Sequence, residues 1–215
     1  HSRLSIIDLS PAGRQPMASP CSRYVLSYNG ELYNHLELRK QLEAEGGYSN
    51  WRGDSDTETV LFALMHWGIE NALKKFNGMF AFAFWDHSNQ TLFLARDRMG
   101  VKPLFYGSCQ NTFLFASELK GLTTCSLFKR EVDRNALSSY LRYNYVPTPL
   151  CIYKDFNKLL PAHYVVIRNN GQSISKPTCY WDLEEIVNTN QSTTQLFEED
   201  CVDELEVLLK DSVSK

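Results

Sequence analysis

Apolar and polar positions alternate most clearly over residues 79–86, MFAFAFWD, where three phenylalanines are interleaved with two alanines. Because successive side chains of a strand point to opposite faces, this run predicts a strand with one face of large side chains and one that allows close approach. Both faces of this strand are expected to be buried. Further strands are predicted at 3–8, 24–28, 91–97, 98–107 and 112–118, with a hairpin over 163–175 that turns at Asn170 and Gly171.

Apolar residues spaced three or four apart predict two helices between the early strands. The first, residues 34–47, begins at Asn34, an expected N-cap, and ends at a pair of glycines. The second, residues 54–68, carries Ser55 and Glu58 at the spacing of a capping box. Since the later strands follow one another at hairpin distances, the pattern favours an antiparallel meander and an α+β class over a parallel sheet.

The C-terminal third of the chain contains a third helix, a linker and a fourth helix. Asp133 is the expected N-cap of a helix over 132–143, with Ala136, Leu137, Tyr140 and Leu141 on one face. The segment 188–195, NTNQSTTQ, is polar and aperiodic and is expected to be a linker. Residues 197–215 are expected to form an amphipathic helix with Val202, Leu205, Leu208 and Leu209 on one face.

Composition narrows the class of protein. The 215 residues are 43% hydrophobic and 22% charged, which is typical of a globular domain, and the net charge of -3 gives no basic footprint for nucleic acid. No apolar run approaches the ~20 residues that span a bilayer, so no membrane partner is expected. The six cysteines are scattered without the spacing of a metal site, and we expect reduced thiols, a cytoplasmic location and no bound metal.

Three spots combine polar chemistry with a strand end or a helix start. Arg3 precedes a strand, and its planar guanidinium suits a carboxylate, although a surface ion pair explains it as well. Asn29 and Gly30 are either a hairpin turn or, since the next residues lead into a helix, a pair of donors for an oxyanion. Asp56 either supports a helix cap or binds a substrate ammonium group.

Together these groups describe a site for an amino acid with a reactive side-chain carbonyl, but no nucleophile accompanies them. None of the histidines or cysteines stands in a recognisable catalytic pattern. Arg96 and Asp97, at the end of a predicted strand, are expected to form a structural ion pair with each other.

Seven blocks resemble, in chain order, the class II glutamine amidotransferase domain of glutamine-hydrolysing asparagine synthetases. They are HSRLSIIDLSPAGRQPM, YNGELYN, SDTE, GMFAFAFWD, ARDRMGVKPLFY, ASELK and KLLPAHY. The resemblance implies a four-layer αββα sandwich of antiparallel sheets, of the N-terminal-nucleophile hydrolase type, truncated here and followed by the start of an α/β synthetase domain. The implied boundaries are a glutaminase domain at 1–187 without its N-terminal strand, a linker at 188–195, and the first synthetase helix at 196–215.

The same resemblance assigns roles to the candidate residues. It implies that Arg3 binds the glutamine carboxylate and that the adjoining Leu4, Ser5, Ile6 and Ile7 line the pocket. It implies that Asn29 and Gly30 form the oxyanion hole. Glu31 and Asp56 are implied to hold the α-amino end of L-glutamine.

The resemblance also implies which parts of the chemistry lie outside this sequence. The family's nucleophile is an N-terminal cysteine that lies before the block matching HSRLSI, so the 215 residues alone are expected to be inactive. ATP and magnesium are expected only in the synthetase domain, with no cofactor in the residues given.

The function implied is to bind and hydrolyse glutamine within an ATP-dependent asparagine synthetase, a ligase of amino-acid biosynthesis, supplying ammonia for amidation of aspartate. Two alternatives stay open: a glutamine-sensing or ammonia-dependent module without catalysis, and a related amidotransferase with another carboxylate acceptor. A homodimer is possible, and the sequence decides neither the oligomeric state nor the acceptor.

Overall fold

The computed structural model describes residues 1, 8–190 and 198–214. The chain divides into two compact units, His1–Trp181 and Asp182–Lys215. All of the strands described lie in the first unit.

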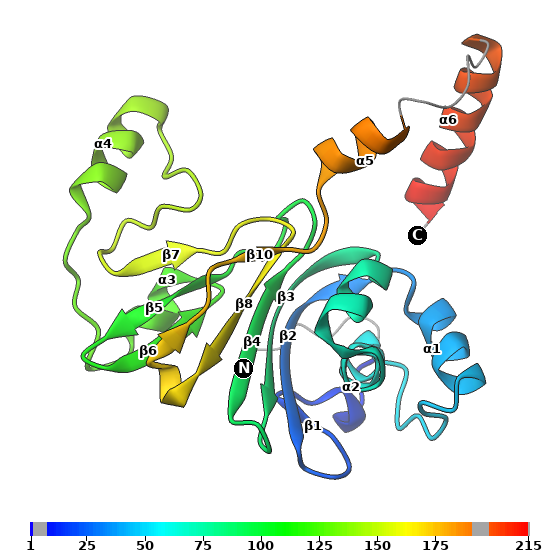
Figure 1. The fold of residues 1–215 in the computed structure, drawn as a ribbon, viewed down its shortest axis with the longest axis horizontal. Coiled ribbons are helices and arrows are strands. Elements are labelled where there is room, and N and C mark those ends of the chain that lie inside the picture. The colour runs from blue at the N-terminus through cyan, green and yellow to red at the C-terminus, as the bar shows by residue number, and fades with distance from the viewer. Residues whose placement is uncertain (2–7, 191–197, 215) are drawn as a thin grey trace. The chain divides into compact units, whose positions relative to one another are not determined.

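The larger sheet of the first unit is antiparallel throughout (Figure 1). In spatial order its strands are β1 (Met17–Ala18), β2 (Tyr24–Leu32), β3 (Gly78–Asp86), β4 (Thr91–Arg96), β8 (His163–Arg168) and β10 (Thr178–Cys179), and β9 (Ser173–Ile174) pairs with β8. The predicted hairpin is confirmed, because β8 and β9 are joined through the 3-10 turn Asn169–Gly171. A second 3-10 turn, Pro11–Gly13, precedes β1.

The smaller sheet has three antiparallel strands in the order β6 (Thr112–Ala116), β5 (Phe105–Cys109) and β7 (Phe156–Lys158). The strand predicted over 98–107 was placed too early, because β5 begins only at Phe105 and residues 98–104 form a loop. Two helices of the first unit follow β6 along the chain, α3 (Leu119–Thr123) and α4 (Arg134–Tyr143).

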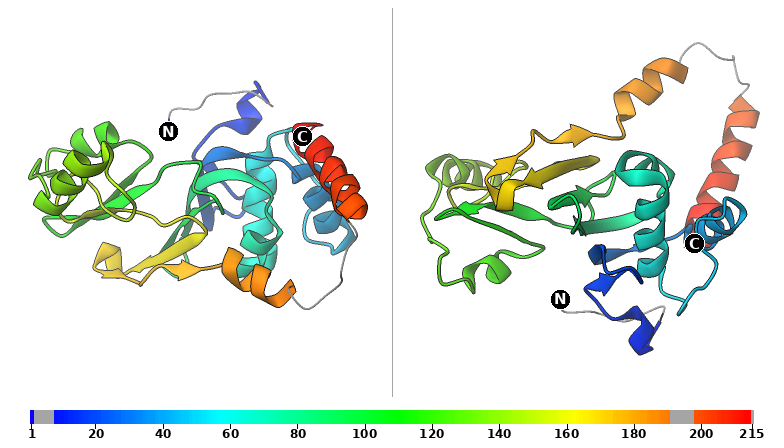
Figure 2. Two further views of the ribbon diagram at one scale, coloured as in Figure 1. Left: turned by 90° about the horizontal axis from the view of Figure 1, so that it is seen from above. Right: turned by 60° about the horizontal axis from the view of Figure 1, so that its bottom comes forward.

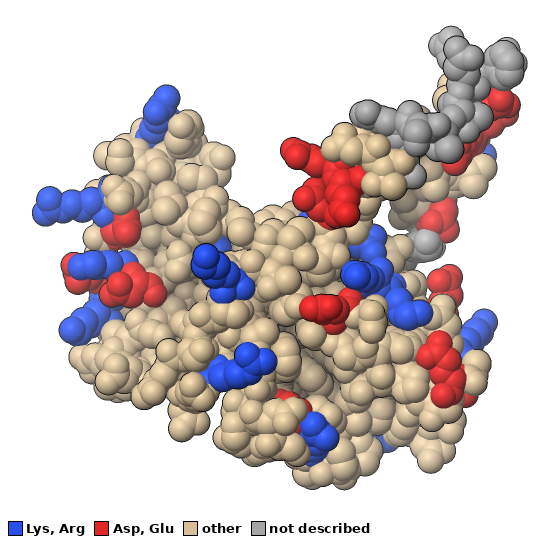
Figure 3. Space-filling view, viewed as in Figure 1, with Lys and Arg blue, Asp and Glu red and all other residues tan. Residues whose placement is uncertain are grey.

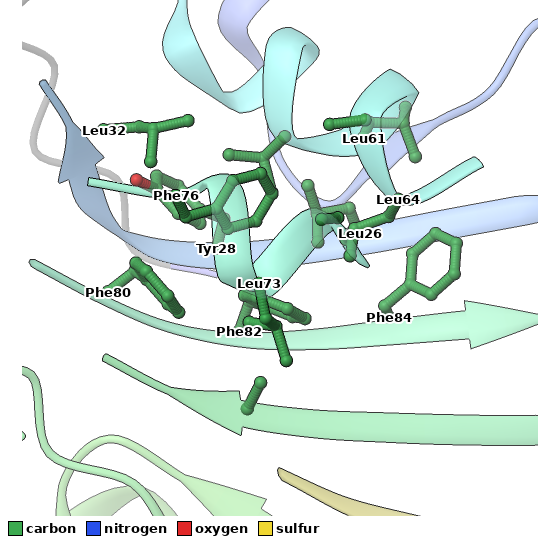
Figure 4. Packing of buried hydrophobic residues seen from close by; sticks show 14 of the residues in the cluster. Leu26, Tyr28, Leu32, Leu61, Leu64, Leu73, Phe76, Phe80, Phe82 and Phe84 are labelled. Atoms are coloured by element: carbon green, nitrogen blue, oxygen red, sulfur yellow. The ribbon is translucent and has the colours of Figure 1, made fainter. Parts of the chain in front are cut away.

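One face of the larger sheet is covered by α2 (Asp56–Lys75), against which α1 (His35–Ala44) packs, as the further views show (Figure 2). Side chains of β2, β3 and α2 converge there in a single apolar cluster (Figure 4). Phe80, Phe82 and Phe84 are all within it and are at most 5% exposed. Fully burying one such aromatic side chain is worth about 1.5–3 kcal/mol, so this interface is a main source of stability.

The other face of β3 carries the two small residues and meets the smaller sheet. Ala81 and Ala83 lie in a second cluster with Leu104, Tyr106 and Leu159. A third cluster lies on α3 and the smaller sheet, where Leu122 packs with Cys109, Cys151 and Phe156. The predicted α+β class, the antiparallel sheets and the two buried faces of β3 are therefore confirmed.

Two helix caps depart from the sequence prediction. Asn34 makes no side-chain cap; its Oδ1 accepts from Asn77 N (3.0 Å) and its Nδ2 donates to Lys75 O (3.0 Å). Ser55 does cap α2, accepting from Thr57 N, but Glu58 does not complete a box and instead accepts from the backbone and side chain of Arg52. In both cases a tertiary partner replaces the local one.

Two further helices differ from the pattern in extent or exposure. The second predicted helix continues past its expected end at Gly68 to Lys75, and Gly68 itself has a positive φ of 73° that kinks it. Asp133 caps α4 as predicted, through Asn135 N and Ala136 N. Of the stripe predicted on α4, only Ala136 is buried, and Leu137, Tyr140 and Leu141 are 40–73% exposed.

The predicted ion pair between Arg96 and Asp97 is wrong, because each side chain binds backbone instead. The Arg96 guanidinium donates to the carbonyls of Gly100, Lys102 and Leu159. The Asp97 carboxylate, 1% exposed, accepts four N–H groups, from Phe80, Met99, Val101 and Lys102. The 98–104 loop is thus built around two buried charges that are satisfied by carbonyl and amide dipoles.

The second unit contains α5 (Leu183–Asn190) and α6 (Glu198–Ser214). Residues 188–190, predicted as the start of a linker, are helical instead, since they complete α5. The apolar residues expected on one face of the last helix, Val202, Leu205, Leu208 and Leu209, are all more than half exposed.

No helix among the described residues is long and apolar enough to cross a membrane. On the face shown in Figure 3, lysine and arginine side chains are scattered among acidic ones instead of forming one basic area.

Asp86, at the end of β3, is held by a two-point contact with Arg23. Arg23 Nε and Nη2 donate to its two oxygens at 2.9 Å each, and Ser88 N and Asn89 Nδ2 also donate to it. These donors, the Arg23 side chain foremost, lower the pKa of Asp86 from 3.8 to about 2. The depressed pKa means that the carboxylate stabilises the fold above pH ~4 and loses this contribution as the pH falls toward 2.

We therefore expect Asp86→Asn to lower the free energy of unfolding by about 1–2 kcal/mol at pH 7, with the difference from the parent shrinking between pH 4 and pH 2. Urea unfolding at several pH values measures this difference. Asp203→Asn, an exposed carboxylate on α6, is the control and should have little effect. A difference that stays constant down to pH 2 would contradict the assignment.

Candidate functional site

The outer edge of β2 is only partly covered by β1, which pairs with Val25 and Leu26. Farther along, side chains take over the N–H groups of alternate residues. Tyr28 N donates to Gln15 Oε1 at 2.6 Å, and Leu32 N donates to Asp56 Oδ2 at 2.9 Å. Since residues 28, 30 and 32 point their N–H groups to the same edge of a strand, Gly30 lies between two capped positions.

The N–H of Gly30 faces this edge for a reason that lies on the neighbouring strand. Gly30 is opposite Phe80 in the β2–β3 ladder, but the N–H and C=O of Phe80 both bind Asp97 instead. The Gly30–Phe80 pair is therefore a non-hydrogen-bonded one, and the polar groups of Gly30 point away from β3. Among the described residues, no acceptor for the Gly30 N–H is found on this edge.

Asn29 projects from the other side of the strand into a cavity between the two sheets. The cavity has a volume of about 940 Å³. Asn29 Nδ2 donates to Ser117 Oγ, at 3.3 Å, across the gap from β2 to the segment after β6. The lining consists of the exposed N-terminal residue, small side chains of β2 and β3, and the start of α3: His1, Ser27, Asn29, Ala81, Phe82, Ala83, Leu104, Phe115, Ala116, Ser117, Glu118, Lys120, Gly121 and Thr124.

Glu31 follows Gly30 and, by strand alternation, lies on the same face as Ser27 and Asn29. It is half-buried, and no lysine or arginine among the described residues is within ion-pair distance of it. A carboxylate in this setting is available to a cationic group of a ligand.

Asp56, in contrast, is engaged within the protein. It is 6% exposed at the first position of α2, and its Oδ2 accepts from Tyr28 O–H (3.1 Å) as well as from Leu32 N. Burial, followed by the charge of Asp56, raises the pKa of Tyr28 well above 10, so the phenol stays a donor. The carboxylate therefore joins α2 to β2 beside Gly30, and a direct role on an α-amino group stays a prediction.

The segment before α2 is held rigidly, which fixes the position of Asp56. Arg39 of α1 is buried and donates to Gly53 O, Ser55 O and Thr59 Oγ1. Nearby, His35 Nδ1 is buried without a hydrogen-bond partner, and burial lowers the pKa of this histidine. The positive end of α2 and a neutral histidine thus surround a fixed carboxylate.

Of the residues predicted from the sequence, Asn29, Gly30 and Glu31 are consecutive in β2, and Asp56 accepts from Leu32 of the same strand, but of these four only Asn29 lines the cavity. Arg3, Leu4, Ser5, Ile6 and Ile7 lie outside the described residues. Two participants were not singled out, Gln15 and Ser117, although they stand in the blocks GRQPM and ASELK. Only their positions inside the blocks that resemble the family could have drawn attention to these two residues.

The site lacks a thiol and a metal centre of its own. None of the six cysteines lines the cavity, and the described residues contain no group of three histidine, cysteine or acidic side chains that could hold a metal ion. The chemistry available here is hydrogen-bond donation to an oxyanion and charge pairing with a polar ligand.

Comparison with known proteins gives this geometry a context. A family model described as "Glutamine amidotransferase domain" matches residues 1–181. Asparagine synthetase 3 of Bacillus subtilis, described as glutamine-hydrolysing, is 37% identical over 218 residues, which is all of this chain and 33% of that protein. The amidase chyE of Penicillium rubens is 36% identical and aligns with 86% of this chain and 26% of its own length.

Solved structures agree on the fold. The glutamine phosphoribosylpyrophosphate amidotransferase of B. subtilis superposes with a TM-score of 0.56 at 21% identity, covering 84% of this chain and 34% of that one. This likeness supports the α+β fold with antiparallel sheets. The chain spans only about a third of the length of the curated relatives it matches.

The link between Asp56, Tyr28 and Leu32 predicts a coupled loss of stability. Asp56→Asn weakens the acceptor shared by the phenol and the backbone N–H, and we expect about 1–3 kcal/mol lower stability, whereas Tyr28→Phe removes one neutral partner and costs about 1 kcal/mol. Urea unfolding of both single variants and the double variant measures the coupling. Strictly additive effects would mean that the two side chains do not interact.

Gly30 is required sterically as well as for its exposed N–H. A Cβ there would lie 2.3 Å from Met79 O and 2.7 Å from Phe80 Cα, both backbone atoms of β3. We expect Gly30→Ala to destabilise the domain by about 3 kcal/mol or more. The control is Gly121→Ala, at an exposed position of α3, where the added Cβ would be 3.2 Å from the side-chain Cβ of Ala116. Equal melting temperatures for the two variants would contradict the argument.

Proposed function

Because this chain belongs to the family of class II glutamine amidotransferase domains related to the glutamine-hydrolysing asparagine synthetases, we propose that its cavity binds L-glutamine for release of the side-chain ammonia. The observation that carries the proposal is that, within the part of the chain that the structure describes, the N–H of Gly30 on the outer edge of β2 has no acceptor, while the preceding residue, Asn29, presents its amide in the cavity. A backbone N–H fixed by the sheet and a side-chain N–H held by Ser117 match the needs of a developing oxyanion.

In the proposed reaction a thiolate attacks the side-chain amide carbon of glutamine. The carbonyl π electrons move onto the oxygen, which is stabilised by Gly30 N–H and Asn29 Nδ2. When the carbonyl re-forms, the C–N bond breaks, and the nitrogen leaves as ammonia after taking a proton. Water then attacks the thioester, releasing glutamate and restoring the thiol.

The remaining parts of the substrate are assigned by charge. Arg3 is proposed to bind the α-carboxylate, with Leu4 to Ile7 beside it, and Glu31 to bind the α-ammonium group, for which its lack of an ion-pair partner among the described residues is the support. Asp56 would act through its fixed charge nearby. The nucleophilic thiol is proposed to come from outside these 215 residues, in a four-layer sandwich of the N-terminal-nucleophile hydrolase type.

For the whole protein, we propose that ammonia is transferred to aspartate in an ATP-dependent synthetase reaction in the cytoplasm. ATP and magnesium are proposed to bind in the synthetase part. Helix α6, with its exposed apolar face, is proposed as the first helix of that part. The similarity to the fungal amidase chyE supports a second candidate, a relative that acts on another carboxylate or amide.

The proposed function predicts activity for the full-length protein that contains this domain and none for the isolated 215 residues. Asn29→Ala should lower kcat for glutamine hydrolysis by about 10²- to 10³-fold, the usual cost of one oxyanion donor. Arg3→Ala should instead raise KM. Asn71→Ala, on the exposed surface of α2, is the matched control. Glutamate and ammonia released from glutamine are the measured products.

Three results would overturn this proposal or change its acceptor. Sustained ammonia release by the isolated chain would mean that one of its own groups is the nucleophile. Full-length protein that hydrolyses glutamine but forms no AMP in the presence of aspartate and ATP would favour the second candidate. Full-length protein without any glutaminase activity would favour a module that senses glutamine or serves a synthetase fed by free ammonia.

A further inference from the structure

Ser117 is the one described residue whose side chain holds the Asn29 amide. It lies directly after β6, at the point where the smaller sheet leads into α3, and lines the same cavity as Asn29. Its Oγ accepts a hydrogen bond from Asn29 Nδ2 at 3.3 Å, and the contact is partly buried. No second hydrogen bond to the Asn29 side chain is found among the described residues.

The geometry points to Ser117 as the positioning residue of the oxyanion hole, a role that rests on the proposed function. An asparagine amide nitrogen has two hydrogens, so one can be given to Ser117 while the other stays free for the substrate. With its nitrogen held, the amide presents that second N–H to a developing oxyanion beside Gly30 N–H. Preorganised donors of this kind need no rearrangement when the charge forms.

Ser117 is needed because the surroundings do not otherwise restrain the side chain. Asn29 faces a cavity of about 940 Å³, where small groups such as Ala81 and Ala83 leave room for the amide to rotate about its last torsion. Loss of the Ser117 hydroxyl would let the amide turn its oxygen toward the substrate carbonyl, which repels a developing negative charge. The residue therefore acts on the orientation of Asn29 and touches no reacting atom itself.

In this arrangement both sheets contribute residues to the oxyanion hole. Asn29 and Gly30 belong to the larger sheet, whereas Ser117 is carried by the smaller one. A hydrogen bond at 3.3 Å tolerates little change in the separation of the sheets. The orientation of the Asn29 amide therefore depends on the position of the end of β6 and of α3.

The test uses the full-length protein and three variants. Ser117→Ala is expected to lower kcat for glutamine hydrolysis by about 10- to 100-fold, less than loss of the donor itself, with KM for glutamine changed by less than about threefold. Ser117→Thr keeps the hydroxyl and should restore kcat to within about threefold of the parent. Ser138→Ala, which removes the same atom from an exposed serine of α4 outside the cavity lining, should leave both parameters unchanged.

Inhibition by the aldehyde analogue of glutamine gives a reading specific to the oxyanion. The thiol sulfur adds to the aldehyde carbon, and the former carbonyl oxygen then occupies the donor pair. Ser117→Ala should weaken this inhibition by about the same factor as kcat, a change that loss of folding or of substrate binding does not produce. A kcat equal to that of Ser138→Ala, or a rise in KM alone, would overturn the assignment.

A spectroscopic measurement separates this inference from the proposed function. In full-length protein labelled with ¹⁵N in asparagine side chains, the Nδ2 hydrogen of Asn29 that binds Ser117 should exchange slowly with solvent. Ser117→Ala should shift its resonance and speed its exchange, while Ser117→Thr should retain the values of the parent. If the parent protein has no glutaminase activity, the proposed function fails while these spectra still decide the contact. Spectra identical in parent and Ser117→Ala would exclude it.

Discussion

The buried carboxylate of Asp97 is the contact on which the site depends most. Its oxygens accept four backbone N–H groups, one of them from Phe80. The backbone N–H of Asp97 also donates to Phe80 O, so both backbone polar groups of Phe80 are occupied. An ionised group at 1% exposure is tolerable only with such a full set of donors. Since Phe80 is thereby turned toward β4, its partner Gly30 must direct its N–H to the outer edge of β2.

Around this edge the fold positions one backbone donor and one side-chain donor. The neighbouring N–H groups of Tyr28 and Leu32 are taken by Gln15 and Asp56, so a single donor remains between two occupied ones. The face of the strand at right angles to this edge carries Asn29 toward the second sheet. Backbone and side-chain donors thus come from adjacent residues of one strand, which is why a short motif suffices to encode them.

The sequence allowed the large features to be predicted and part of the site. Alternation identified β3 and its two unequal faces. The turn considered at Asn29 and Gly30 does not form, because both residues lie within β2, and their role as a donor pair stays a prediction. What failed were pairings between neighbours in sequence, at Asn34 and at Arg96 with Asp97, because backbone groups of Lys75, of Leu159 and of the 98–104 loop competed better. Gln15 and Ser117 could not be assigned for the same reason, being 13 and 88 residues from their partners.

The two faces of β3 restrict the choice of side chain in different ways. On the phenylalanine face, any well-packed apolar side chain of similar size serves stability, so substitutions there trade one packing for another. On the alanine face, a valine or leucine at 81 or 83 would suit a buried strand better by propensity and would occupy the space that a ligand needs. Substitutions that would pack the two sheets more tightly and raise the stability of the domain are therefore disfavoured at residues 81 and 83. At these two positions the proposed ligand needs a volume that no side chain fills.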